Sequence, residues 1–185
     1  MRNYHEFIDE TLVNPEALNR RIAELGAEIS RDYAGQDLHL VCILRGGVMF
    51  LTDLIRQIDI PLTVDFMAVS SYGASARQST GQVRITLDLK DEIHDRNVML
   101  VEDIVDSGYT IASVIELLRT RHPRSIKVCT LLDKPERREV EVPIDYCGFV
   151  IPNKFVFGYG LDIDEYYRNL PFIATVDLKK YNPEG

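Results

Sequence analysis

The segment 98–110, VMLVEDIVDSGYT, places the strongest constraint on how this chain can fold. It opens with the apolar run 98–101 and continues with three acids, Glu102, Asp103 and Asp106. A short loop rich in small residues follows, where a helical pattern begins. We therefore expect a buried strand whose C-terminal end carries acids, then a loop at a helix N-terminus. Such acids can hold a metal ion or sugar hydroxyls, and the amides of such a loop can hold a phosphate.

The same segment also has a purely structural explanation. Acids after a strand often only cap the next helix, and Asp106 or Ser107 could do that alone. However, three carboxylates within five positions repel one another unless a cation or a hydroxyl-rich ligand lies among them. The whole pattern therefore favours a site for a ribose and its 5′-phosphate.

Strands and helices alternate through the middle of the chain. Apolar runs predict strands at 38–44, 62–69, 83–87, 98–101 and 126–132, and shorter ones at 146–151, 155–157 and 173–176. Helical spacing predicts helices at 15–33, from 48 to about 58, and around 111–118. This order predicts an α/β fold with a mostly parallel central sheet and helices on both faces.

Ligands of such sheets bind beyond the C-terminal ends of the strands. Three loops stand at such ends and should share one edge of the sheet: LRGG at 44–47, EDIVDSGYT at 102–110 and DKP at 133–135. A cation and glycine amides beside a sugar-phosphate site favour a diphosphate site at 44–47, with an ordinary tight turn as the alternative. Lys134 follows a buried strand, where a rigid turn could direct it into a cleft. The small, polar segment 70–81 is expected to form a mobile loop.

Composition argues against several other classes of protein. The 185 residues are 45% hydrophobic, which fits one folded domain, and the net charge of −8 disfavours a sequence-independent grip on nucleic acid. The basic residues nearest to forming a patch, among them Arg137 and Arg138, are expected to be mostly solvated surface. The three cysteines are widely spaced among apolar residues, as in the core of a protein from a reducing compartment. The N-terminus is too polar for a signal peptide and no apolar run approaches a membrane span, so a cytoplasmic protein is expected.

The motifs together resemble a known family. VEDIVDSGYT is similar to the phosphoribosyl-pyrophosphate signature of the type I phosphoribosyltransferases. Further motifs follow that family's order and narrow the resemblance to its hypoxanthine(-guanine) branch: LRGG at 44–47, SSYG at 70–73, STG at 79–81, LLDKP at 131–135, PNKFVFGYGLD at 152–162 and EYYRNLP at 165–171. The resemblance runs from about residue 5 to 178. It implies a single phosphoribosyltransferase domain over 1–185, with a core at about 36–150 and a small hood from about 1–14 and 151–185.

The resemblance implies a site for the donor, 5-phosphoribosyl 1-pyrophosphate. Glu102 and Asp103 match acids that engage the ribose hydroxyls and a magnesium ion, and Asp162 matches a second magnesium ligand. The 5′-phosphate loop is matched by Ser107, Gly108, Tyr109 and Thr110. The pyrophosphate loop, which carries a non-proline cis peptide in the family, is matched by Leu44, Arg45 and Gly46, and Arg168 matches a further pyrophosphate contact. Some members of the family have lysine in place of Tyr109, and some have lysine in place of Arg45. The backbone amide of Tyr109 can still donate a hydrogen bond to the phosphate.

The resemblance also implies a site for the purine. Asp106 matches the proposed general base near purine N7, and Lys134 matches the lysine that recognises the 6-oxo group. Phe155 matches the aromatic residue that stacks on the base, and Val156 supplies backbone contacts to its edge. The loop that closes over the reaction, and so keeps water away, is matched by Ser71 and Tyr72.

The implied activity is a magnesium-dependent transfer of the 5-phosphoribosyl group to hypoxanthine and guanine in cytoplasmic purine salvage. A homodimer or homotetramer is expected, with no nucleic-acid or membrane partner. Two alternatives remain open: a non-catalytic regulator that senses the donor and binds nucleic acid, and a transferase of similar fold that acts on xanthine or a pyrimidine. Lys134 and Phe155, which serve a purine pocket, disfavour the regulator, as does the net charge of −8.

Overall fold

The computed structural model describes residues 3–71 and 83–181, which form two sheets and four α-helices. The large sheet has the strand order β4-β3-β2-β5-β6-β7, and the small sheet has the order β1-β9-β8. The large sheet consists of β2 (His39–Leu44), β3 (Thr63–Ser71), β4 (Val83–Leu87), β5 (Asn97–Val105), β6 (Ser125–Asp133) and β7 (Tyr146–Val150). The small sheet consists of β1 (Ile8–Val13), β8 (Val156–Phe157) and β9 (Ile173–Val176). The helices are α1 (Pro15–Asp32), α2 (Val48–Ile55), α3 (Tyr109–Arg119) and α4 (Leu178–Tyr181).

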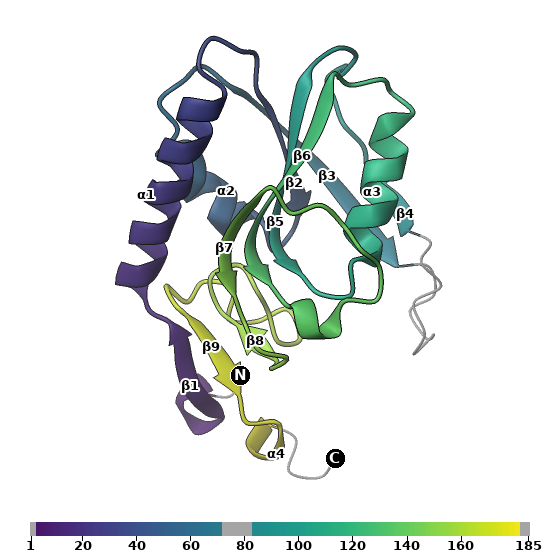
Figure 1. Cartoon of the computed structure of the whole chain (residues 1–185). Helices are drawn as coiled ribbons and strands as arrows, with labels where there is room; N and C mark the ends of the chain where they lie inside the picture. The colour runs from purple at the N-terminus through teal and green to yellow at the C-terminus, as the bar shows by residue number, and fades with distance from the viewer. Residues whose placement is uncertain (1–2, 72–82, 182–185) are drawn as a thin grey trace.

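The large sheet is parallel from β3 to β7, and β4 pairs antiparallel with β3 at one edge. Figure 1 shows α1 and α2 on one face of this sheet and α3 on the other. The predicted α/β fold, with a mostly parallel central sheet and helices on both faces, is confirmed.

The central strands are buried on both faces, which explains why they are continuous apolar runs in the sequence. In β2, Leu40 and Cys42 belong to the apolar cluster under α1 and α2, whereas Val41 and Ile43 belong to the cluster under α3. Burying one Leu, Ile or Val side chain stabilises the fold by about 1.5–3 kcal/mol. The two clusters therefore fix the sheet between its helices. Cys42 and Cys129 are buried and have free thiols, as expected for core positions.

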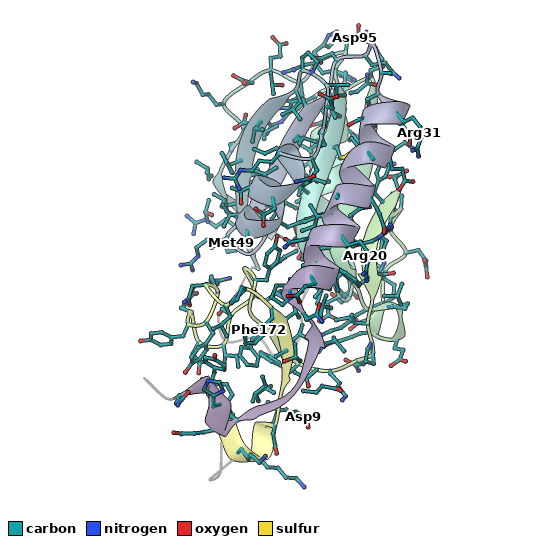
Figure 2. All side chains as sticks on the ribbon, turned by 90° about the vertical axis from the view of Figure 1, so that its left-hand side faces the viewer. Asp9, Arg20, Arg31, Met49, Asp95 and Phe172 are labelled. Carbon is teal, nitrogen blue, oxygen red and sulfur yellow. The ribbon has the colours of Figure 1, made fainter. Side chains whose placement is uncertain are left out.

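The first helix begins where the sequence predicts. The Asn14 side chain accepts a hydrogen bond from the Ala17 amide at 2.8 Å, and Pro15 occupies the first turn. The stripe that α1 buries against the sheet contains Leu18, Ile22, Leu25 and Ile29. Figure 2 looks onto this helix, with Arg20 and Arg31 on its outer side.

The largest boundary correction concerns β5. The strand does not end at Val101 but runs to Val105, because Ile104 and Val105 continue the ladder with β6. Glu102 and Asp103 therefore lie inside the strand rather than after it. Their backbones are fixed by the sheet, which positions the acids more rigidly than a loop would.

Three smaller differences concern other elements. α2 ends at Ile55 rather than near Ile58, and the Gln57 amide donates to the Leu54 carbonyl in a tighter turn. Neither β1 nor α4 is predicted from the sequence. β1 exposes most of its side chains and pairs with β9, so both ends of the chain meet in the small sheet (Figure 1).

The small sheet occupies one end of the molecule. Figure 2 places Asp9 and Phe172 in this region and Asp95 at the opposite end of the large sheet. Within the described ranges, no helix is long and apolar enough to cross a membrane.

Candidate active site

The C-terminal ends of β2, β5 and β6 bring the three expected loops to one edge of the large sheet. Gly46 lies so close to β5 that a Cβ atom in its place would overlap the Asp103 carboxylate. From the third loop, Lys134 Nζ lies 3.7 Å from Asp106 Oδ2. The prediction that the three loops meet is therefore confirmed.

The larger of two adjoining cavities, with a volume of about 630 Å³, opens at this edge. Phe155 contributes an aromatic ring that is 49% exposed, whereas Val156 and Lys134 are buried. Its full lining is Asp103, Ile104, Asp106, Lys134, Arg137, Asn153, Lys154, Phe155, Val156, Leu161, Asp162 and Leu178. An accessible aromatic face, apolar walls and a buried ammonium suit a flat heterocycle that carries a hydrogen-bond acceptor.

A second cavity of about 230 Å³, called the smaller cavity below, adjoins the first. It is lined by Glu102, Ile104, Val105, Asp106, Ser107, Gly108, Thr110 and Ile111. Ile104 and Asp106 line both cavities, so one ligand can extend from the first into the second.

The smaller cavity lies at the N-terminus of α3. Gly108 is the N-cap residue, with φ of +93°, and a Cβ atom there would overlap the Val140 carbonyl oxygen. No side chain of the described residues caps this helix, so neither Asp106 nor Ser107 has the purely structural role that the sequence left open. The amides of the first turn remain for an anion, which the helix dipole also favours.

Glu102 and Asp103 are both buried. Burial raises the pKa of Glu102, and the neighbouring Asp103 carboxylate raises it further; burial also raises the pKa of Asp103. Glu102 Oε2 has no hydrogen-bond partner among the described residues. A cation or hydroxyl groups at this point would relieve both the repulsion and the unmet hydrogen bond.

The three expected magnesium ligands do not form a closed cluster. Asp103 and Asp162 line the larger cavity, whereas Glu102 lines the smaller one. Over residues 3–71 and 83–181, no group of three or more His, Cys, Asp or Glu side chains is arranged to hold a metal ion by itself. Magnesium commonly binds one or two carboxylates together with water and substrate phosphates, and such a site needs no closed cluster.

Asp106 lies between two cations at the junction of the cavities. Lys134 approaches Oδ2, and Arg137 Nε lies 3.3 Å from Oδ1. Oδ1 nevertheless accepts no hydrogen bond from the described residues, because the Arg137 contact lacks hydrogen-bond geometry. Burial lowers the pKa of Lys134, and the Asp106 carboxylate opposes that shift. The arrangement presents an acceptor oxygen beside a buried donor.

Arg138 corrects the expectation of solvated surface. Its guanidinium is largely buried and pairs with Asp133, and its Nε donates to the Asp106 carbonyl at 3.0 Å. It also donates to the Val105 carbonyl at 3.3 Å. Arg138 thus ties the end of β5 to the end of β6. Arg137 is likewise a cavity residue that the sequence alone does not distinguish from surface.

Arg45 and Arg168 meet over one carboxylate. Arg45 Nη2 lies 2.8 Å from Glu165 Oε1, and Arg168 Nη2 lies 3.0 Å from Glu165 Oε2. Arg168 also pairs with Asp162 at 2.7 Å. The peptide between Leu44 and Arg45 is cis, as the resemblance implies.

The remaining predicted residues are placed only in part. Tyr109 is the first residue of α3, and Ser71 ends β3 at the same edge of the sheet. Tyr72 and the rest of the expected loop to residue 81 lie outside the described residues. Asn153, Lys154, Leu161 and Leu178 line the larger cavity but are not predicted from the sequence. The first three lie inside the PNKFVFGYGLD motif at 152–162, but nothing in the sequence around Leu178 indicates the cavity.

Known proteins match this chain over most of its length. Residues 10–164 match the family model of the phosphoribosyl transferase domain. The hypoxanthine-guanine phosphoribosyltransferase of Mycobacterium avium is 52% identical over 180 residues, which cover 94% of this chain and 88% of that protein. The hypoxanthine phosphoribosyltransferase of Salmonella typhimurium is 47% identical, with coverage of 91% and 96%. The crystal structure of a hypoxanthine phosphoribosyltransferase from Staphylococcus aureus has a TM-score of 0.92 and 44% identity and covers 96% of each chain. The chain therefore belongs to the phosphoribosyltransferase family, in its hypoxanthine(-guanine) branch.

Proposed function

We propose that this enzyme transfers the 5-phosphoribosyl group from 5-phosphoribosyl 1-pyrophosphate to hypoxanthine and guanine, forming IMP or GMP and pyrophosphate in purine salvage. The observation that carries the proposal is the junction of two cavities at Asp106. One begins at free helix amides, which suit a phosphate, and the other holds a buried lysine and an accessible aromatic ring. Together they match the two ends of a nucleoside monophosphate.

The donor's 5′-phosphate binds in the smaller cavity, in the loop formed by Ser107, Gly108, Tyr109 and Thr110. Its negative charge is stabilised by the amides and the dipole of α3. Arg138 donates to the backbone just before this loop, and the Glu139 and Val140 amides donate to the Ser107 carbonyl, so the loop is held in place and the phosphate anchors the ribose in a fixed position.

The pyrophosphate binds across Leu44, Arg45, Gly46 and Arg168. The leaving group gains charge as its bond to the ribose breaks, and guanidinium groups and backbone amides already in place stabilise that charge. Ser71, the last residue of β3, and Tyr72 are proposed to begin the loop that excludes water, which would otherwise hydrolyse the activated sugar.

The acids Glu102, Asp103 and Asp162 are proposed to hold magnesium together with the donor. The unmet Glu102 Oε2 and the raised pKa of the buried pair fit a cation and ribose hydroxyls. When bound, magnesium supplies positive charge that offsets the charge of the pyrophosphate.

The purine binds in the larger cavity, stacked on Phe155 and held at its edge by the backbone of Val156. Lys134 donates a hydrogen bond to the 6-oxo group of hypoxanthine or guanine. The 6-amino group of adenine is itself a donor and would not accept this hydrogen bond. Asp106 accepts the N7 proton as the purine attacks the ribose, because it is an acceptor placed where both cavities meet. The loss of that proton keeps positive charge from building up on the purine.

The test is product formation by the purified protein with the donor, magnesium and each of hypoxanthine, guanine, xanthine, adenine and uracil. We expect IMP and GMP, with adenine and uracil far slower. The absence of IMP would refute the proposal. Efficient turnover of uracil or xanthine alone would refute the assignment of the base pocket.

The proposal extends to domain organisation and assembly. A core at about 36–150 carries a hood from about 1–14 and 151–185, a division supported by the pairing of β1 with β9 and by the contact of Phe7 with Phe157 at 5.6 Å between ring centroids. The enzyme is proposed to act in the cytoplasm as a homodimer or homotetramer without nucleic-acid or membrane partners. Light scattering that shows only a monomer would refute the assembly.

A further inference from the structure

Glu165 is the centre of an ion-pair network that joins the two expected pyrophosphate arginines. Each of its carboxylate oxygens faces a different guanidinium: Oε1 faces Arg45, and Oε2 faces Arg168. Arg45 follows β2, whereas Arg168 lies more than a hundred residues later, so the carboxylate links separate parts of the chain. The hydrogen bond from Arg168, with a smaller contribution from Arg45, lowers the pKa of Glu165. The residue is therefore an anion near neutral pH.

The backbone around Glu165 holds this carboxylate in place. Asp164, Glu165 and Tyr167 have φ of +51°, +70° and +71°, a conformation that residues other than glycine rarely adopt. Arg168 is anchored independently, since Nη1 donates to the Gly160 carbonyl at 2.7 Å. Unusual backbone of this kind gathers at ligand-binding and switch segments, where the surrounding structure enforces it.

We propose that Glu165 is an internal competitor of pyrophosphate: it occupies Arg45 and Arg168, and the pyrophosphate group must displace it from both. This inference rests on the proposed function, because it takes the two arginines as pyrophosphate contacts. The exchange favours the ligand, since pyrophosphate carries more charge than one carboxylate and can bridge both guanidinium groups. Glu165 and Arg45 are more than half exposed, so their ion pair is weak and readily broken.

The competition between Glu165 and pyrophosphate favours release of this product. When pyrophosphate leaves, the carboxylate returns to the arginines, so that Arg45 regains a counter-ion and Arg168, which also pairs with Asp162, regains its second one. Glu165 thereby lowers the affinity for the product pyrophosphate and sets how strongly that product inhibits the enzyme.

The experiment compares the parent enzyme with Glu165→Gln and with the matched control Glu24→Gln. Glu24 is 53% exposed and pairs with Arg21 at 2.8 Å on α1, so the control makes the same change in charge and breaks the same kind of pair. With magnesium present, calorimetry gives the Kd of pyrophosphate, and kinetics give its inhibition constant against the donor. Glu165→Gln should tighten pyrophosphate binding by about three- to tenfold, whereas Glu24→Gln should stay within about twofold. The difference should shrink at high salt.

Unchanged or weaker pyrophosphate binding in Glu165→Gln would overturn the inference, because Glu165 would then only order the arginines. If the parent still forms IMP, the proposed function survives that result. A parent that neither forms IMP nor binds pyrophosphate would overturn both. If Glu165→Gln does not fold, Glu165→Gly decides, since glycine adopts a φ of +70° without strain and should show the same tightening.

Discussion

Replacing Gly108 by alanine should damage this enzyme much more than replacing Gly35, although both glycines have a positive φ. Gly35 has φ of +73° and no atom within 4 Å of a Cβ placed there. Gly108 has φ of +93°, and its Cβ would overlap the Val140 carbonyl oxygen and lie 3.0 Å from Arg138 Cδ. The pair therefore separates the cost of the backbone conformation from the cost of the steric overlap.

The two costs can be given magnitudes. The left-handed conformation costs an alanine about 1–2 kcal/mol at either position. Moving the Val140 backbone and Arg138 adds about 1–3 kcal/mol at Gly108 alone, by analogy with overpacked cores. Since 1 kcal/mol shifts the Tm of a domain of this size by about 2–4 °C, Gly35→Ala should lower the Tm by about 5 °C and Gly108→Ala by about 10 °C.

The activities should separate the variants more clearly still. Gly108 belongs to the proposed 5′-phosphate loop, so Gly108→Ala should raise the KM for the donor about tenfold or more, whereas Gly35→Ala should leave it unchanged. Thermal unfolding and donor kinetics on the two variants check this. Equal losses of Tm, or an unchanged donor KM in Gly108→Ala, would refute the steric argument.

Three further predictions concern charged and titrating groups. Asp106→Asn should reduce kcat by about 10²–10⁴-fold while donor binding is kept, whereas the control Asp88→Asn, at an exposed pair with Arg121, should retain kcat; a fully active Asp106→Asn would remove the proposed base. Lys134→Gln should narrow the preference for hypoxanthine over adenine by at least about tenfold, because an amide can accept as well as donate; an unchanged ratio of kcat/KM values would contradict the role of Lys134. Burial and Arg96 lower the pKa of His39 from 6.5, so the unfolded chain takes up a proton that the folded protein does not as the pH falls below 6.5. The Tm of the parent should therefore fall more steeply than that of His39→Gln between pH 6.5 and about pH 5, and parallel curves would count against this linkage.

The sequence predicts the large sheet well because its strands are buried on both faces. An apolar run such as 38–44 is stable only where it is buried. The Asn14-Pro15 pair marks a helix start because the asparagine side chain caps the helix and proline fits its first turn. β1 is missed because its residues, IDETLV, are mostly exposed and gain their order from β9, more than 150 residues away. β5 is predicted too short because two adjacent acids suggest a loop, and only the ladder with β6 shows that the strand continues.

The candidate site, like the fold, is predictable from the sequence only in part. The loops at strand ends are predictable because parallel topology brings them together, and the cavities at Asp106 and Lys134 follow from it. Which cation is buried is not predictable, since Arg137 and Arg138 are alike in sequence but only Arg138 is anchored to two carbonyls and Asp133. The contact of Glu165 with Arg45 is also hidden, because it joins residues 120 positions apart.

The pairing of the first strand with the last has a consequence during synthesis on the ribosome. All strands of the large sheet lie between His39 and Val150, so the half proposed to bind phosphate can fold while later residues are still being added. β1 must wait, unpaired, until Ile173–Val176 has emerged. The half proposed to recognise the base, which includes Phe155 and Val156, is therefore completed last, and a nascent chain should hold the sugar phosphate before it can select a purine.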